Sequence, residues 1–313
     1  MITGRSPNVS VIIPTYNRAH IVGRAIQSVL DQTYQDFEIV VIDDGSNDNT
    51  EEVVKGFTDE KIRYIRIRHG KNNSPSAAIN AGIKAARGKY VAFLDSDDEW
   101  VKKKLEKQMS VFKEVPSSVG VVYAGLLRIE GDRRIYIPSP RIEPKEGDIH
   151  DNLLKGNFVT PPTVIAKKEC FTKVGAFDEQ LPRLEDWELW IRISKCYHFK
   201  YIDEPLVISY HMPDSRSAKR DNLIKAYKMI LEKHFKNIQK YRRPLAEHYL
   251  YVGHLLCLSG EMQQGRNYFM KAMSIRTYPL NIKFFLPTFI SLFGQSTYVK
   301  IRKLYRKFEQ VIK

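Results

Sequence analysis

Cysteine is scarce in this sequence of 313 residues, and the few copies follow no recognisable pattern. The three cysteines, Cys170, Cys196 and Cys257, are odd in number and lie far apart. They therefore form neither the disulfide framework of a small secreted domain nor the ligand spacing of a zinc site. We expect the protein to work in a reducing compartment.

Long apolar segments are also missing. No window reaches the roughly 18 uninterrupted apolar residues that a membrane-spanning helix needs. The opening stretch MITGRSPNVSVII lacks the apolar segment of a secretory signal, so we expect a cytoplasmic protein. No GxGxxG pattern follows the first strand-like segment, which argues against a dinucleotide-binding dehydrogenase.

Negative charge is sparse in the last third of the chain. Residues 1–214 contain 30 Lys and Arg against 31 Asp and Glu, whereas residues 215–313 contain 20 against 5. We expect one large domain over residues 1–214 and a basic helical region over residues 215–313. The basic region suits an anionic membrane surface more than nucleic acid, for which no recognised binding module is present. Its charge would also serve solubility alone.

Strand and helix signals alternate along the first hundred residues. Runs of β-branched and other apolar residues predict strands over 9–14, 37–43, 62–67 and 90–95. Apolar residues at helical spacing predict helices over 18–32 and 76–86. This alternation indicates an α/β fold with a mostly parallel sheet flanked by helices.

The pattern changes after residue 100. We expect a helix over 101–113, strands over 119–137, a loop over 138–162, a helix over 185–194, and strands over 199–202 and 206–210. In the basic region, residues 246–273 resemble a single tetratricopeptide-like hairpin, which should pack on the catalytic body or on a partner. Residues 284–293 form an apolar run with basic flanks, long enough to lie in a membrane interface.

Three polar segments follow predicted strands: PTYN (14–17), DDGS (43–46) and DSDD (95–98). In open α/β sheets, ligands bind outside the carboxyl ends of the strands. We therefore expect these segments, which are distant in sequence, to meet along one edge of the sheet. This convergence is the central structural prediction.

The DSDD segment crowds three carboxylates into four positions. Mg²⁺ and Mn²⁺ prefer oxygen ligands and commonly combine one or two carboxylates with substrate phosphates. Asp95 and Asp97 would provide half of such a site. The alternative interpretation is a solvated turn in which Asp98 caps the helix expected over 101–113.

The other two segments offer groups that can hold a nucleotide base. Gly45 permits a left-handed turn, and Asp44 can accept a hydrogen bond from a ring N–H such as uracil N3. Tyr16 offers a ring for stacking, although a partly buried core tyrosine is equally compatible with the PTYN fragment.

A further acidic pair, Glu185 and Asp186, opens the aromatic helix EDWELWIRIS. Two explanations are open for these carboxylates. They can complement the helix dipole, or they can place a carboxylate beside aromatic walls, which is a setting that tunes a general base.

Taken together, these segments resemble the family 2 glycosyltransferases, which are inverting enzymes with the GT-A fold. The resemblance is carried by the order and the intervals of VSVIIPTYNR (9–18), VVIDDGSNDNT (40–50), GKYVAFLDSDDEW (88–100), VGAFDE (174–179) and EDWELWIRIS (185–194). It covers roughly residues 8–212. It implies a GT-A type sheet for that part of the chain, and the basic helical region expected from composition then forms a C-terminal extension.

The resemblance also implies residue roles at the donor end of the site. Pro14, Thr15 and Tyr16 would contact the base and ribose, and Asp44 would hold the base. Asp95, Ser96 and Asp97 would form the DXD-type motif, with Asp95 near the ribose and Asp97 on the Mn²⁺ or Mg²⁺ that bridges the diphosphate.

For catalysis, the resemblance implies that Asp186 is the general base and that Glu185 positions it. His211 would contact the metal or the diphosphate, or else be a surface histidine. The chain departs from many relatives at Ile79, where they carry arginine, and Lys71 would supply the missing positive charge.

The implied activity is metal-assisted transfer of a sugar from a nucleotide-sugar donor, with UDP-sugars favoured. The acceptor would be a hydroxyl in polysaccharide, lipid-linked glycan or glycoprotein synthesis, at the inner face of the cell membrane. Two alternatives remain open: glycosylation of a polyprenyl phosphate, and a non-catalytic protein that binds sugar nucleotides or acts as a scaffold.

Overall fold

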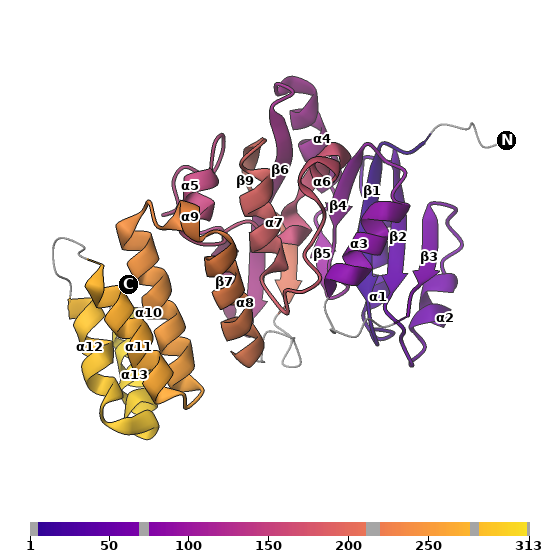
Figure 1. Ribbon diagram of the computed structural model, residues 1–313. Helices are drawn as coiled ribbons and strands as arrows, with labels where there is room; N and C mark the ends of the chain where they lie inside the picture. The colour runs from indigo at the N-terminus through magenta and orange to yellow at the C-terminus, as the bar shows by residue number, and fades with distance from the viewer. Residues whose placement is uncertain (1–5, 69–74, 211–219, 276–281, 312–313) are drawn as a thin grey trace. The chain divides into compact units, whose positions relative to one another are not determined.

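The chain divides into two compact units in the computed structural model, residues 1–215 and residues 216–313 (Figure 1). The structure describes residues 6–68, 75–210, 220–275 and 282–311. Each unit is described by itself.

The described part of the first unit contains a mixed sheet of nine strands in the order β3–β2–β1–β4–β8–β6–β9–β5, with β7 paired to β6. Four parallel strands form one side of it: β1 (Val9–Thr15), β2 (Phe37–Asp43), β3 (Ile62–Arg66) and β4 (Tyr90–Phe93). The remaining strands are β5 (Asp98–Trp100), β6 (Val119–Glu130), β7 (Arg133–Ile137), β8 (Ile165–Lys167) and β9 (His198–Tyr210).

Helices of this unit flank the sheet (Figure 1). They are α1 (Val22–Leu30), α2 (Thr50–Lys55), α3 (Pro75–Ala85), α4 (Lys104–Glu114), α5 (His150–Leu153), α6 (Lys168–Val174) and α7 (Glu185–Ile193), with a 3₁₀ turn η1 at Pro161–Thr163. All seven residues of β2 and all four of β4 are buried, as expected for central strands covered on both faces. The predicted α/β architecture is confirmed.

Two local predictions are corrected in the second half of this unit. The strands predicted over 199–202 and 206–210 are one strand, β9, which pairs with β6 through register shifts around Gly125. A bulge of this kind keeps the pairing continuous where the apolar alternation is interrupted. The loop predicted over 138–162 contains the short helix α5 and the start of η1.

The second unit is helical in its described residues. It contains α8 (Arg220–Lys233), α9 (Phe235–Ile238), α10 (Arg242–Leu258), α11 (Met262–Ser274), α12 (Ile282–Ser291) and α13 (Gly294–Val311). None of the described helices combines the length and the apolar character needed to cross a membrane.

The hairpin predicted over 246–273 corresponds to α10 and α11, which pack closely because two glycines face each other. A Cβ on Gly253 would lie 2.5 Å from the Phe269 ring, and one on Gly265 would lie 2.3 Å from Cys257 Sγ. Helices α8, α12 and α13 pack against this pair within the same unit. They provide the cover that a single hairpin lacks, which we had expected from the catalytic body or from a partner.

Candidate active site

The carboxyl ends of β1, β2 and β4 meet at one edge of the sheet. Register pairs Thr15 with Asp43, and the Asp44 amide donates to the Thr15 carbonyl at 2.9 Å. On the other side of β1, the Leu94 amide donates to the Ile12 carbonyl at 3.0 Å, so Asp95 follows directly at the same edge. The three polar segments therefore converge as the sequence predicts.

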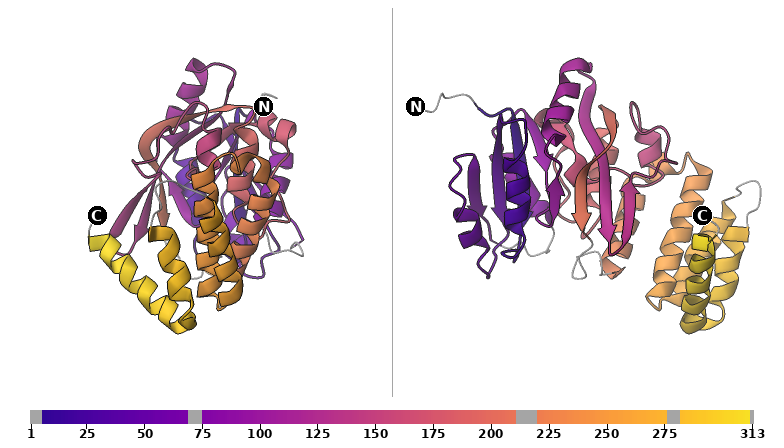
Figure 2. Two further views of the ribbon diagram at one scale, coloured as in Figure 1. Left: turned by 60° about the vertical axis from the view of Figure 1, so that its left-hand side comes forward. Right: turned by 180° about the vertical axis from the view of Figure 1, so that it is seen from behind.

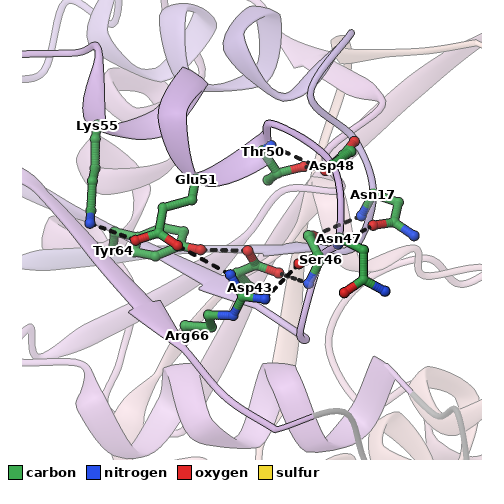
Figure 3. Close-up of polar contacts among 10 residues, drawn as sticks. All are labelled: Asn17, Asp43, Ser46, Asn47, Asp48, Thr50, Glu51, Lys55, Tyr64 and Arg66. Atoms are coloured by element: carbon green, nitrogen blue, oxygen red, sulfur yellow. Dashed lines mark hydrogen bonds and ion pairs between the residues drawn. The ribbon is translucent and has the colours of Figure 1, made fainter.

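Asp43 holds the DDGS turn in shape (Figure 3). One carboxylate oxygen accepts from the Ser46 amide at 2.8 Å, and the other accepts from the hydroxyl of Tyr64 on β3. Burial and the bond to Asp43 both raise the pKa of Tyr64. Gly45 has a φ of 78°, which is the left-handed conformation expected of it.

Side chains also tie the PTYN segment to the turn after β2 (Figure 3). The backbone amide of Asn17 donates to Ser46 Oγ at 2.8 Å, and the backbone amide of Asn47 donates to Asn17 Oδ1 at 2.8 Å. The Ala19 amide donates to Asp48 Oδ2 at 3.0 Å. Because these bonds cross between the two segments in both directions, the two loops form one frame.

The residues expected to contact a nucleotide line this frame with different exposures. Pro14 and Tyr16 are half-buried, so the tyrosine ring retains an accessible part. Thr15 and Asp44 are buried, each with 3% of its surface exposed. The Thr15 hydroxyl has no hydrogen-bond partner within the described residues. A buried hydroxyl of this kind suits a polar group of a ligand, since leaving it unpaired costs about 1–3 kcal/mol.

The structure brings the DSDD segment and the acidic pair of α7 together. Burial raises the pKa of Asp95 well above its ordinary value, and the charges of Asp98, Asp97, Glu185 and Asp186 raise it further. These interactions require the carboxylates to lie within electrostatic range of one another across a partly dry site. Two motifs about ninety positions apart thus form one acidic centre.

Asp98 does not have the capping role that was its alternative interpretation. It lies in β5, with 4% of its surface exposed, whereas α4 begins at Lys104 without a side-chain cap. Burial and the neighbouring Asp97 raise the pKa of Asp98 to about 7, against a hydrogen bond from Ser209 and the charge of Arg128.

Arg24 on α1 holds the DSDD turn from the outside, and no sequence pattern indicated it. Its guanidinium donates to the Asp97 carbonyl at 2.8 Å and pairs with Glu99 Oε1 at 2.9 Å. It also lies over the Tyr210 ring, 4.3 Å from the centroid. Arg24 therefore connects the turn carrying Asp97 to the end of β9.

Two buried tryptophans anchor the helix that carries the acidic pair. Trp187 Nε1 donates to the Leu153 carbonyl at 2.6 Å, and Trp190 Nε1 donates to the Val159 carbonyl at 3.0 Å. Leu184 precedes the helix in a left-handed conformation, with a φ of 61°. The start of α7 is thus fixed against the segment between α5 and η1.

That segment also contacts Asp186 directly. Asn157 Nδ2 donates to Asp186 Oδ2 at 2.7 Å. Burial raises the pKa of Asp186, while hydrogen bonds from the Trp187 amide and Asn157 and the charge of Arg183 oppose the rise. The sequence predicted neither Asn157 nor Arg183 at the site. The bond from the Trp187 amide is compatible with both sequence interpretations of the acidic pair, as a complement to the start of the helix and as a base.

The departure at Ile79 has a structural consequence. Ile79 is 6% exposed and belongs to the core, so it offers no polar group to the site. The next residue, Asn80, docks the VGAFDE segment: it donates to the Phe177 carbonyl at 2.9 Å and to Glu179 Oε1 at 2.8 Å. Lys71, proposed to replace the missing positive charge, and His211 lie outside the described residues.

The acidic centre fits a hard divalent cation that a ligand would share. The described residues contain no cluster of three or more His, Cys, Asp or Glu side chains arranged to hold a metal on their own. Asp95 and Asp97 follow a strand end, and the raised pKa of Asp95 reports uncompensated negative charge there. Mg²⁺ and Mn²⁺ characteristically take one or two carboxylates and complete their shell with phosphate oxygens and water.

A shallow hollow of about 370 Å³ lies away from these carboxylates. Its lining includes Asn8, Asp36, Gly88 and Lys168, which sit at the starts of β1, β2 and β4 or at the end of β8. It therefore opens at the edge of the sheet opposite the acidic centre.

Comparison with known proteins identifies the fold and the family. Residues 10–172 match Glycosyl transferase family 2, which is more than half of the chain. The chain belongs to this family. An uncharacterized glycosyltransferase of Rickettsia prowazekii is 33% identical over 207 residues, which are 65% of this chain and 64% of that protein. The chain thus spans less than two thirds of that relative, and 36% of a second one from Rickettsia felis.

A relative with a named activity is similar over most of its length. The Escherichia coli protein WfgD, named a UDP-Glc:alpha-D-GlcNAc-diphosphoundecaprenol beta-1,3-glucosyltransferase, is 31% identical over 233 residues. The match covers 70% of this chain and 82% of WfgD.

Solved structures establish the same fold at low sequence identity. S. aureus TarS in complex with UDP-GlcNAc superposes with a TM-score of 0.67 at 18% identity, covering 96% of this chain and 92% of that chain. The mannosyltransferase PcManGT from Pyrobaculum calidifontis, in complex with GDP-Man and Mn²⁺, gives 0.58 at 17% identity over 97% and 89%. The predicted GT-A type fold is confirmed.

Proposed function

We propose that this chain is an inverting glycosyltransferase that moves a sugar from a nucleotide-sugar donor, a UDP-sugar in the first instance, to an acceptor hydroxyl. The observation that carries the proposal is that the carboxylates of Glu185 and Asp186 lie close enough to the DSDD turn for their charges to act on Asp95. The DSDD carboxylates suit the departing diphosphate and its metal, and the pair Glu185 and Asp186 suits the attacking hydroxyl.

The donor end of the site would use the frame formed by the PTYN and DDGS loops. Tyr16 stacks on the base, Pro14 and Thr15 contact the base and ribose, and Asp44 accepts from a base ring N–H. Asp43 has both oxygens engaged by Ser46 and Tyr64, so it shapes the turn and leaves recognition to Asp44.

The diphosphate would lie over the DSDD turn. Asp97 and Asp95 would hold Mn²⁺ or Mg²⁺ there, and this cation, when bound, offsets the negative charge that grows on the leaving diphosphate. Ser96, which is 8% exposed, lies between the two carboxylates in the sequence. The complex of PcManGT with GDP-Man and Mn²⁺ shows that a protein with this fold can bind a nucleotide sugar together with a metal, which supports metal assistance here.

Asp186 would act as the general base. Its pKa is raised by burial, so it accepts a proton more readily than an ordinary aspartate as the acceptor hydroxyl attacks. Hydrogen bonds from Asn157 and from the Trp187 amide hold the carboxylate in place. Glu185 would position Asp186. Attack from the face opposite the diphosphate inverts the anomeric centre.

The acceptor would be lipid-linked. WfgD is named for an acceptor on diphosphoundecaprenol, and a lipid-linked acceptor is held at a membrane surface. A site at the inner face of the cell membrane agrees with the basic composition of residues 215–313.

The test is a titration of UDP-, GDP- and dTDP-sugars by calorimetry, with and without Mn²⁺, followed by turnover of the donor that binds. We expect Asp97→Asn to lose the Mn²⁺-dependent part of donor binding. We expect Asp186→Asn to keep donor binding and to lose turnover by about a thousandfold. Full turnover in either variant would overturn its assigned role, and binding without turnover by the wild type would favour the non-catalytic alternative.

A further inference from the structure

A turn joins α12 and α13 at one end of a helical hairpin (Figure 2). The side chains on and beside this turn include four exposed large apolar residues. We call this group the hairpin tip and define it as Leu286, Phe289, Leu292 and Phe293. The exposed fractions are 38% for Leu286, 60% for Phe289, 63% for Leu292 and 58% for Phe293. Phe289 and Phe293 contact each other edge to face, with centroids 5.2 Å apart.

The exposure does not result from poor packing of α12. Thr288 Oγ1 contacts Met273 Sδ at 3.9 Å, and Arg266 Nη1 donates to the Ser291 carbonyl at 3.2 Å, so the inner side of the helix is seated on α11. The outer side alone is uncovered. Three of these side chains lie at or next to the turn, and Leu286 lies one helical turn earlier on α12. Exposed apolar side chains grouped in this way form a patch of the kind that marks an interaction site.

The helices that carry the tip are predominantly basic. Residues 261–313 contain ten Lys and Arg against two acidic residues, Glu261 and Glu309. Lys271 on α11 and Lys300 on α13 are exposed. An apolar tip on a strongly basic helical scaffold is complementary to a surface that is apolar inside and anionic at its boundary.

We propose that the hairpin tip inserts into the interface of an anionic lipid bilayer while the surrounding lysines and arginines bind the headgroups. Aromatic and leucine side chains at the tip of a turn can enter the headgroup and acyl boundary without a spanning helix. Basic residues near the surface add electrostatic attraction, which acts within about one Debye length. The surface is independent of the transfer reaction, so it can be tested separately from the proposed activity.

The experiment uses the full chain and co-sedimentation with vesicles of phosphatidylcholine, alone or mixed with phosphatidylglycerol. We expect binding to the mixed vesicles, weakened by added salt, and little binding to phosphatidylcholine alone. The variant Phe289→Ser with Phe293→Ser should lower the partition coefficient by at least about tenfold, because it removes the buried apolar area.

A matched control is Phe235→Ser on α9, which removes an aromatic side chain that is 40% exposed outside the tip. It should bind vesicles as the wild type does. Both variants should keep the wild-type melting temperature, since the replaced rings are exposed.

Three results would overturn the proposal. Wild-type partitioning of the double variant would assign any binding to charge alone. Equal binding to both kinds of vesicle would show that the anionic lipid is not needed for binding. A wild-type dimer in light scattering that becomes a monomer in the double variant would assign the tip to a second copy of this chain.

Discussion

The two units of this protein treat charge in opposite ways. In the first, many carboxylates are paired with cations, as in Glu38 with Arg63 at 2.8 Å and Glu188 with Arg192 at 2.9 Å. The carboxylates of the acidic centre, at the rim of the sheet, instead repel one another. In the second, twenty Lys and Arg face five acidic residues over 215–313. The comparison indicates where ligands of each sign belong: a cation at the rim and an anion on the helical unit.

The largest expected effect tests whether the rim must be held in place. Arg24→Ala removes the support of the Asp97 carbonyl and of Glu99, so kcat should fall about a hundredfold, because small misplacements of a reacting group cost that much. Arg24→Lys should recover only part of the lost kcat, since lysine lacks the guanidinium fork. The measurement is a kcat and KM comparison at saturating Mn²⁺. A change in KM alone, with kcat intact, would contradict a positioning role in the transfer step.

The second prediction tests whether the units fold separately. Gly253→Ala places a methyl group 2.5 Å from the Phe269 ring and should destabilise the helical unit by about 2 kcal/mol. Calorimetric unfolding should then show a lower transition for this unit and an unchanged one for the sheet. Gly156→Ala in the first unit is the control, because its Cβ would meet nothing within 4 Å. A single transition that shifts as a whole would show that the two units unfold together.

A third prediction concerns proton transfer at the rim. Asn157→Leu removes a hydrogen bond that lowers the pKa of Asp186, so this pKa should rise further. A base must be unprotonated to act, and the acid limb of the kcat profile should therefore move to higher pH, by about one unit. The control is Asn152→Leu, whose amide donates to the Pro144 carbonyl. If the acid limb of the kcat profile does not move, Asp186 is not the group that accepts the proton.

The smallest effect concerns a lysine that the first unit buries. Lys104 is fully buried over the Trp100 ring, 3.8 Å from its centroid, and its Nζ has no hydrogen-bond partner within the described residues. Burial lowers its pKa, so the proton it binds in the unfolded chain opposes folding below about pH 10.4.

Lys104→Met should therefore stabilise the first unit by about 1 kcal/mol at neutral pH, with the gain shrinking toward pH 10. Thermal unfolding at several pH values checks the trend, with Lys113→Met at an exposed position of α4 as control. A pH-independent difference between the variant and the wild type would show that Lys104 takes up no proton when the protein unfolds in this pH range.

Much of the sheet was predictable because its central strands are buried on both faces. Runs such as FEIVVID allow few other structures, and β2 covers the predicted residues 37–43. The strand β9 was predicted in two pieces because Asp203 and Glu204 interrupt the apolar pattern at the bulge. Sequence periodicity cannot distinguish a bulge from a loop.

The site was predictable where its residues fall at strand ends. Topology alone brings 14–17, 43–46 and 95–98 together, so these segments were found. Arg24 and Asn157 were missed because each is a single polar residue, on a helix surface and in a loop, whose role depends on tertiary contact. The hydrogen bond that gives Asn157 its role joins positions 29 residues apart.

The anchoring of α7 bears on how acceptor specificity can be altered. The indoles of Trp187 and Trp190 and the carboxylate of Asp186 form hydrogen bonds with the end of α5 and with the stretch that leads from it to η1. Grafting that stretch from a relative without its own helix would cut all three attachments at once. A chimera designed to accept a different sugar should therefore exchange residues 150–163 and 184–194 as one cassette, with the donor-side loops left in place.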